Sequence, residues 1–213
     1  MKRTQIEQSI KTAIAANEPL MIYGSPGLGK SDTVRKVAKE LEMEIFDVRA
    51  SLLDPVDVRG LPVPDKESGL VNWMVPEFWP QENKSSLLFF DELTNAPQSV
   101  QTALLQMVLD RQCGSYKLPG EVRIIAAGNL ATDKAGSSAL ITSLRSRFLN
   151  VNYEVDLADW VDWAWSADVC ETVIQFIRFR PGQLHDFDPR SKENAFPCPR
   201  SWEKLSNVKK AKV

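Results

Sequence analysis

One eight-residue segment constrains the possible folds of this chain more than any other feature. It runs from Gly24 to Ser31 and matches the pattern G-x-x-x-x-G-K-S at every position. The apolar run Leu20 to Tyr23 precedes it, and apolar residues recur at helical spacing after it. A strand, a glycine-rich loop and a helix in this order are typical of a phosphate-binding site, whereas a plain Gly-Pro turn does not need the complete pattern.

The residue types in this segment suit a bound polyphosphate. Glycine lets the backbone turn so that successive N–H groups point at an anion, and the following helix adds its positive end. Lys30 would reach the outer phosphates, and the Ser31 hydroxyl would hold Mg²⁺. The predicted nucleotide-binding residues are Gly24, Ser25, Pro26, Gly27, Leu28, Gly29, Lys30 and Ser31.

A second segment ends in two acidic residues. Leu87 to Phe90 form a continuous apolar run, which is typical of a parallel strand buried on both faces, and ligands bind at the carboxyl ends of such strands. Asp91 can complete the Mg²⁺ shell, and Glu92 can orient and deprotonate a water aimed at the γ-phosphate. The alternative is that these acidic residues are only a charged pair at an exposed strand end. The complete phosphate loop elsewhere in the chain favours the catalytic interpretation over this alternative.

Three further polar side chains are candidates for the same site. Asn129 closes an apolar strand that begins at Val122, and its amide can hydrogen-bond both a γ-phosphate and the attacking water. An asparagine at a strand end is, however, more often a turn residue. A helical pattern over residues 139–150 includes Arg145 and Arg147, which cannot share a helix face and so serve different contacts. Arginines near a helix end are also common as dipole partners or solvated charges.

Residues 51–83 differ in composition from the rest of the chain. They contain five prolines, two glycines and the aromatic residues Trp73, Phe78 and Trp79. This composition favours a long ordered loop or hairpin over a helix. Because loops of this length are usually functional, we expect an interaction element rather than a structural excursion. The spacing of acidic residues over residues 54–60 matches no standard ligand pattern, so a metal loop there is not expected.

The overall composition limits the remaining possibilities. The chain has 213 residues, enough for one α/β domain with a smaller appendage, and its net charge of −2 gives no global basic field for nucleic acid. Its three cysteines lack C-x-x-C spacing, so we expect neither a disulfide framework nor a zinc site, and we expect a reducing compartment. No apolar run approaches the ~20 residues of a membrane span. These features predict a cytoplasmic protein with no membrane partner.

Periodicity predicts the other elements of the first part of the chain. An amphipathic helix precedes Pro19, and a short strand covers Glu44 to Val48. Another helix follows Pro97, and residues 113–118 form a small hairpin. We expect these elements to build an α/β nucleotide-binding core over residues 1–155.

The composition changes after Asp156 to a tryptophan-rich helical pattern. A second helix is predicted to start at Asp168, with Glu171 closing a capping box, and a last helix is predicted to start at Pro199. These helices predict a partial helical lid over residues 156–213.

Taken in chain order, the motifs resemble those of an AAA+ ATPase. The resemblance rests on the phosphate loop, the acidic strand, the strand ending at Asn129, the Ser146-Arg147-Phe148 corner and Pro199-Arg200. Three segments look more narrowly like the MoxR branch, namely Asp57 to Pro62, Ser143 to Phe148 and Ala195 to Trp202. The resemblance implies a P-loop NTPase core of three layers with a parallel sheet, a small α-helical lid, and ATP and Mg²⁺ as ligands.

The same resemblance implies roles for individual residues. Asn129 takes the sensor 1 position, and Arg200 takes the sensor 2 position, which reports the γ-phosphate from the lid. Arg147 fits an arginine finger that reaches the nucleotide of a neighbouring subunit, while Arg145 assists it or holds the interface. A finger supplied by a neighbour implies a ring, usually a hexamer. Residues 51–83 match an insertion that such proteins display around the pore.

The expected function is that of an ATP-hydrolysing motor or chaperone that remodels a protein client. MoxR-like proteins typically serve partners with a von Willebrand factor A domain, and the mild acidity of this chain favours a protein client. One alternative is a nucleic-acid motor or loader, which shares the same ATPase residues. Another is a nucleotide-gated binding switch with little turnover, although the acidic residue Glu92 speaks against it.

Overall fold

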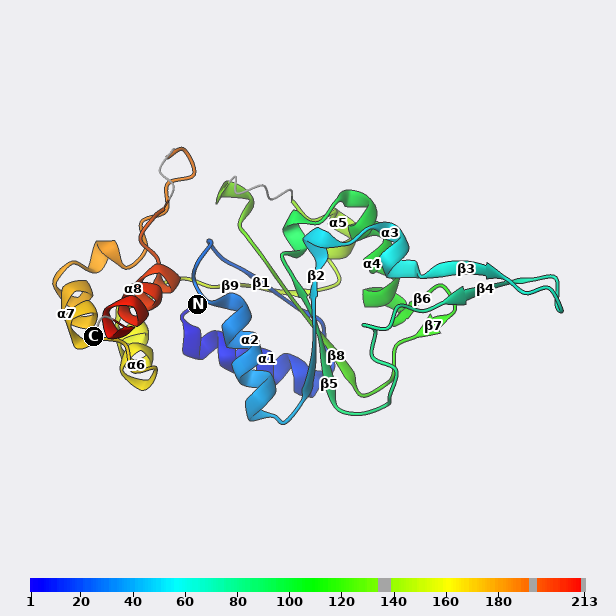
Figure 1. Ribbon diagram of the computed structural model, residues 1–213, viewed down its shortest axis with the longest axis horizontal. Helices are drawn as coiled ribbons and strands as arrows, with labels where there is room; N and C mark the ends of the chain where they lie inside the picture. Colours follow the sequence, from blue (N-terminus) through cyan, green and yellow to red (C-terminus); the bar gives the residue numbers. More distant parts are fainter. Residues whose placement is uncertain (134–138, 192–194, 212–213) are drawn as a thin grey trace.

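The computed structural model describes residues 1–133, 139–191 and 195–211 of the chain. A five-stranded sheet lies at its centre (Figure 1), and all of its neighbouring strands run parallel. This arrangement confirms the predicted α/β fold with a parallel sheet. It also brings the carboxyl ends of the strands to one edge, where ligands bind in such folds. In spatial order, the strands are β2 (Glu44–Arg49), β5 (Ser86–Asp91), β8 (Val122–Gly128), β1 (Leu20–Tyr23) and β9 (Leu149–Asn152).

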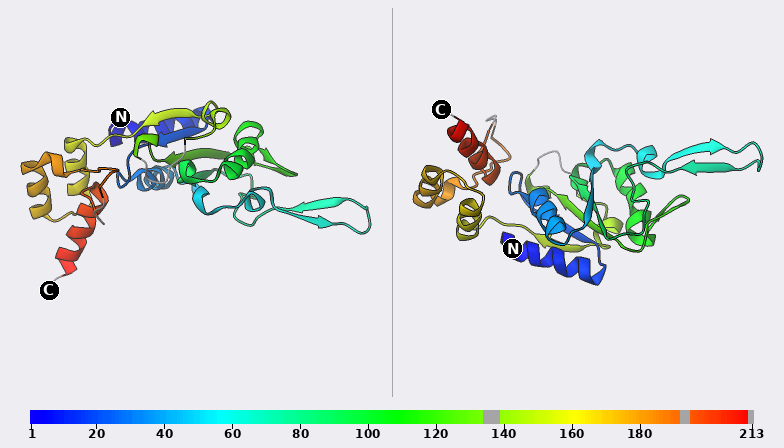
Figure 2. Two further views of the ribbon diagram at one scale, coloured as in Figure 1. Left: turned by 90° about the horizontal axis from the view of Figure 1, so that it is seen from above. Right: turned by 60° about the horizontal axis from the view of Figure 1, so that its bottom comes forward.

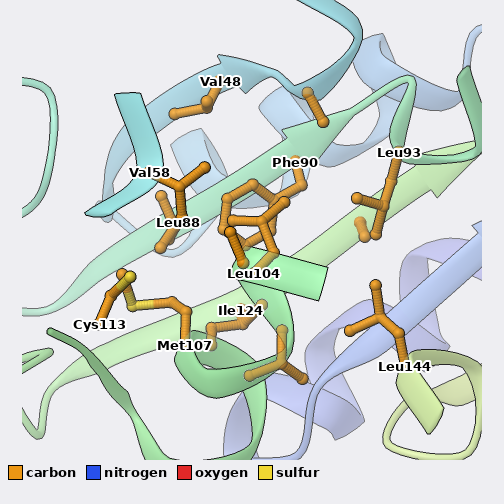
Figure 3. Close-up of a cluster of buried hydrophobic side chains, with 14 of the residues drawn as sticks. Val48, Val58, Leu88, Phe90, Leu93, Leu104, Met107, Cys113, Ile124 and Leu144 are labelled. Atoms are coloured by element: carbon orange, nitrogen blue, oxygen red, sulfur yellow. The ribbon is translucent and has the colours of Figure 1, made fainter. Parts of the chain in front are cut away.

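Alternate residues of the central strands face two separate layers of helices. Leu87 and Phe89 pack into the first layer, while Leu88 and Phe90 pack into the second, which Figure 3 shows in close-up. Each fully buried side chain of this kind stabilises the fold by roughly 1.5–3 kcal/mol. The first layer holds α1 (Arg3–Ala16) and α2 (Lys30–Glu40), and the second holds α3 (Pro55–Arg59), α4 (Gln98–Asp110) and α5 (Thr142–Arg145).

The edge strand β9 departs from the sequence prediction. The helical pattern over residues 139–150 yields only the four-residue helix α5, and the chain then pairs with β1 as a parallel strand. Leu149 and Asn150 are exposed, and Val151 is only partly buried. Its four residues do alternate between apolar and polar side chains, but this alternation is too short to outweigh the helical pattern over the same stretch.

The proline-rich insertion forms an anchored base and a projecting hairpin. Its base holds the short helix α3, which the composition did not predict, because Pro55 occupies the first turn and Asp54 and Asp57 form a capping box. Trp79 is 1% exposed, and its indole N–H donates a hydrogen bond to the Val58 carbonyl. The predicted hairpin follows α3 as β3 (Leu61–Pro64) and β4 (Val71–Met74) and extends away from the sheet in Figures 1 and 2.

The two prolines of β3 determine which edge of the hairpin carries hydrogen-bond donors. The Asp65 N–H donates a 2.8 Å hydrogen bond to the Leu70 carbonyl, so these opposite residues occupy a hydrogen-bonded position. Alternation along the antiparallel pair then places Pro62 and Pro64 at non-bonded positions, opposite Trp73 and Val71. The outer edge of β3 therefore presents their carbonyl groups and no N–H groups.

The predicted lid, within the residues that the structure describes, contains three α-helices around a small apolar cluster of its own. The predicted start of the middle helix at Asp168 is wrong. Asp168 has a left-handed φ of 55° and closes the preceding helix, while Cys170 is the N-cap of the next, so no capping box joins Asp168 to Glu171. The last helix starts at Pro199, as predicted. The lid helices are α6 (Leu157–Ser166), α7 (Glu171–Phe179) and α8 (Pro199–Ala211).

Strands β6 (Gln112–Cys113) and β7 (Tyr116–Lys117) form the hairpin that the sequence predicted. Across the described ranges, every helix is too short or too polar to traverse a lipid bilayer.

Candidate functional site

The segment from Gly24 to Gly29 forms a loop between the end of β1 and the start of α2. Gly27 and Gly29 have left-handed φ angles of 82° and 84°, which favour glycine. A Cβ atom on Gly27 would lie 2.4 Å from the Cys198 sulfur of the lid, so glycine is also required by space there. The loop therefore has the backbone that an anion cradle needs, and the lid packs directly against it.

Lys30 is held inside this loop by oxygen acceptors. Its Nζ donates hydrogen bonds to the carbonyl oxygens of Gly24 and Ser25 at 2.6 and 3.0 Å, and to Asn129 Oδ1 at 3.1 Å. The side chain is 9% exposed, and this burial lowers the pKa of Lys30 to about 8. Lys30 at the start of α2 and Asn129 just after β8 thus meet in one site.

Ser31 and Asp91 form a second direct contact between the two principal motifs. The Ser31 hydroxyl donates a 2.7 Å hydrogen bond to Asp91 Oδ2. A hydroxyl and a carboxylate oxygen side by side are hard oxygen ligands, which Mg²⁺ prefers, and Mg²⁺ sites in proteins need only one or two carboxylates. The donor set at this position therefore fits the predicted metal.

Glu92 lies beside Asp91 and is held by a residue that the sequence analysis missed. Its backbone is left-handed, with φ at 55°, and its carboxylate accepts a 2.7 Å hydrogen bond from the Ser51 hydroxyl. Ser51 follows the end of β2, the strand that pairs with β5. The only indication in the sequence is its place three residues after the end of the predicted strand Glu44 to Val48.

Arg200 approaches the loop from the lid. Its backbone N–H donates a 3.2 Å hydrogen bond to the Gly27 carbonyl, and its side chain is exposed. The ring of His185 also contacts this loop, with Nε2 lying 3.2 Å from the Pro26 carbonyl. A polar cavity of about 250 Å³ adjoins the loop. Besides the loop itself, its lining residues are Lys30, Ser31, Arg35, Arg49, Asp91, Glu92, Asn129 and Arg200.

The two remaining candidate residues lie elsewhere. Neither Arg145 nor Arg147 lines the phosphate cavity in the part of the chain that the structure describes. Both are exposed near the end of α5, and Arg147 lines a different hollow together with Asn17, Glu18 and Arg111. The structure therefore does not bring these arginines to the nucleotide loop of their own chain.

A second, mainly apolar cavity of about 70 Å³ adjoins the loop, and the sequence analysis did not find it. Leu28 and Thr33 line it from the core, and Trp160 and Pro199 line it from the lid. Trp160 is buried, and its indole N–H has no hydrogen-bond partner among the described residues. Its walls come from segments far apart in the sequence, so no local pattern identifies it.

Comparisons with known proteins agree with this geometry. A family model described as the MoxR domain in the MoxR-vWA-beta-propeller ternary systems matches residues 1–173. Midasin from Giardia intestinalis is 27% identical over 186 residues, which are 82% of this chain but 4% of that protein.

Solved structures with a similar fold include two further proteins. The P216G mutant of RuvB from Thermotoga maritima aligns with a TM-score of 0.62 at 16% identity, over 96% of this chain and 60% of that chain. NtrX from Brucella abortus in complex with ADP aligns with a TM-score of 0.55 at 19% identity, over 96% of this chain and 47% of that chain. The chain thus spans about half the length of these structures. Since the family model covers most of its length, the chain belongs to the MoxR branch of the AAA+ ATPases.

Proposed function

We propose that this chain binds ATP with Mg²⁺ and hydrolyses it to ADP and phosphate. The observation that carries the proposal is the convergence of Lys30, Ser31, Asp91, Glu92 and Asn129 on one polar cavity. A phosphate loop alone would support nucleotide binding only. The carboxylate of Glu92 adds a base for the attacking water, and the amide of Asn129 adds a group to orient it.

The residues of the chain divide the work of the reaction. Lys30 exchanges its carbonyl acceptors for oxygens of the outer phosphates, and Ser31 and Asp91 would hold Mg²⁺, which offsets phosphate charge when bound. Asn129 orients a water, and Glu92 accepts a proton from it while the water oxygen bonds to the γ-phosphorus. The bond from that phosphorus to the oxygen bridging the β- and γ-phosphates breaks, which leaves ADP and inorganic phosphate.

The adjoining apolar cavity suits the base of the nucleotide. It lies against Gly29 of the loop, and its wall is mostly apolar, although charged residues such as Asp159 and Glu203 also line it. Flat heteroaromatic rings bind in such slots through apolar contact and a few placed donors. The lid then closes over both the base and the phosphates, with Arg200 acting as the sensor 2 residue.

Several chains complete the site by assembling in a ring, for which a hexamer is our proposal. The supporting observation is that Arg147 and Arg145 are exposed and lie outside the phosphate cavity of their own chain. Arg147 and Arg145 can therefore reach a transferring phosphoryl group only in the site of a neighbouring chain. Arg147 is the proposed finger, and Arg145 assists it or holds the interface.

The proposed substrate of the motor is a protein client, with a von Willebrand factor A domain protein as the partner. The name of the matching family supports this partner class, because it describes MoxR domains in systems with such a domain. The projecting hairpin supports a protein contact, since its large apolar residues are exposed although two-stranded hairpins are marginally stable in water. We assign the hairpin to contact with the client or partner.

Turnover measurements test the central proposal. Wild-type protein should release phosphate from ATP in the presence of Mg²⁺, whereas Glu92→Gln should bind ATP without turnover and Lys30→Ala should not bind it. A matched control is Glu171→Gln, an exchange of the same chemistry at an exposed position of helix α7. Normal hydrolysis by Glu92→Gln would refute the assigned base, and a wild-type protein that binds no adenine nucleotide would refute the function as a whole.

A further inference from the structure

Arg49 is a cation at the phosphate cavity for which neither the sequence motifs nor the proposed reaction has given a role. It is the last residue of β2, and it lines the same cavity as Lys30 and Arg200. Among the described residues, four cationic side chains line this cavity, namely Lys30, Arg35, Arg49 and Arg200. Their bonding partners separate them into two groups.

Two of the four cations already have partners. Lys30 donates to carbonyl oxygens and to Asn129, as described above. The Arg35 guanidinium is bound by Asp47 at 2.7 Å and by Asp32 at 3.0 Å. The side chains of Arg49 and Arg200, by contrast, make no hydrogen bond or ion pair with any residue that the structure describes, and both are exposed. These two guanidinium groups are therefore available to an anionic ligand.

Strand geometry shows which face of the sheet Arg49 occupies. Its neighbour Val48 belongs to the second-layer cluster, so alternation places Arg49 on the first-layer face, with α2. Asp47 lies on that same face, where Arg35 of α2 binds it. Arg49 lies two residues nearer the carboxyl end of the strand and is in register with Asp91, whose carboxylate accepts the Ser31 hydroxyl. This places Arg49 beside the start of α2, where the outer phosphates are expected.

We propose that Arg49 binds the γ-phosphate of ATP from the sheet side, within its own chain, and so lets the site distinguish ATP from ADP. This inference rests on the proposed nucleotide function. The γ-phosphate would lie between two guanidinium groups, that of Arg49 from the sheet and that of Arg200 from the lid. Guanidinium donors suit phosphate oxygens because they form paired, charge-assisted hydrogen bonds. The α- and β-phosphates remain with the loop, so ADP does not need Arg49.

Binding measurements on Arg49→Ala test this assignment. The affinity for ADP should stay within about twofold of wild type, whereas the affinity for the slowly hydrolysed analogue ATPγS should fall about tenfold or more, as expected for one lost charge-assisted hydrogen bond. Arg49→Lys should restore part of the difference, because an ammonium keeps the charge but not the paired geometry. Arg178→Ala, on the exposed side of α7, is the matched control and should leave both affinities unchanged.

The outcomes separate this inference from the proposed function. If wild-type protein binds neither ADP nor ATPγS, the nucleotide function itself fails. If wild type binds both and Arg49→Ala keeps the wild-type ratio of the two affinities, only the assignment of Arg49 fails. Titrations at protein concentrations where sedimentation shows a single chain also test whether Arg49 acts within its own chain. A loss of ATPγS binding that appears only in the assembled ring would mean that Arg49 acts on a neighbouring chain, and it would overturn the assignment within one chain.

Discussion

Ser51 donates a 2.7 Å hydrogen bond to the carboxylate of Glu92. Ser51 lies at the start of the insertion that carries the projecting hairpin, and Glu92 follows the acidic end of β5. The contact therefore joins the base proposed for hydrolysis to the element proposed for client contact. A partner that moves the insertion would change how Glu92 is held.

Replacing Ser51 with alanine tests this link. Without the hydroxyl, Glu92 is free to turn toward a water, so we expect basal ATP turnover to rise about three- to tenfold, in line with the ~1 kcal/mol of a typical hydrogen bond. Phosphate release in the absence of any partner measures this effect, and Ser51→Thr, which keeps a hydroxyl, should resemble wild type. A lower turnover in Ser51→Ala would mean that Ser51 holds Glu92 in its working position.

The buried position of Lys30 predicts a pH dependence of nucleotide binding. Phosphate oxygens bind the protonated amine, and the pKa of Lys30 in the free protein is about 8 because burial disfavours its charge. Above that pH the protein must take up a proton to bind, so the affinity for ADP should fall by up to tenfold per pH unit. Titrations at pH 7.5 and 9.5 without metal measure the fall. Calorimetry in buffers of different ionisation enthalpy should measure the proton taken up on ADP binding. Binding at pH 9 without proton uptake would contradict the lowered pKa of Lys30.

The same lowered pKa affects stability in the opposite direction. In the unfolded chain Lys30 has its ordinary pKa of 10.5, so between pH 8 and 10.5 the unfolded state binds more protons than the folded state. The contribution of this group to the free energy of unfolding therefore rises with pH across that window. Lys30→Met should remove both this contribution and nucleotide binding.

Mixing two inactive variants tests the finger proposed to act between chains. Arg147→Ala should bind ATP normally and lose hydrolysis in the assembled ring, and Glu92→Gln should do the same. A mixed ring contains interfaces where an intact Glu92 faces an intact Arg147 from the next chain, so phosphate release should reappear on mixing. Arg145→Ala, mixed in the same way, compares the two arginines. Full activity of Arg147→Ala as a single chain would show that no neighbour is needed.

Two tryptophans of the insertion should respond very differently to alanine. Trp79 is 1% exposed and donates a hydrogen bond to Val58, so Trp79→Ala should lower the free energy of unfolding by about 3–5 kcal/mol. Trp73 is 40% exposed on the hairpin, and Trp73→Ala should change it by less than about 0.5 kcal/mol. Urea unfolding measures both. A large loss in Trp73→Ala would show that the hairpin packs against the body of the protein.

The parts of the site that sequence reasoning found are those with a local pattern. The phosphate loop and the acidic end of β5 each lie within one short segment, and their backbone requirements restrict the residue types. Asn129 was only a candidate from its place at the end of an apolar strand, and its sensor 1 role came from the family resemblance. Ser51 was not, since its partner lies 41 residues away and the contact depends on which strands are neighbours in the sheet.

The missed elements have separate physical reasons. Strand β9 is an exposed edge, so burial places no apolar run on it. Helix α3 did have a local pattern, with Pro55 in the first turn between Asp54 and Asp57, but the prolines around it favoured a loop. Asp168 and Glu171 have the spacing of a capping box, yet the left-handed backbone at Asp168 ends one helix before the next begins.

The prolines of β3 determine whether the β3–β4 hairpins of neighbouring chains in the proposed ring can pair with one another. A neighbouring β4 strand that approached the outer edge of β3 would meet acceptors without donors at Pro62 and Pro64. The hairpins of neighbouring chains therefore cannot pair edge to edge into one continuous sheet. Each hairpin remains separate from those of the other chains. In a ring of the kind proposed above, one subunit can therefore bend its hairpin toward a bound protein while the hairpins of its neighbours stay in place.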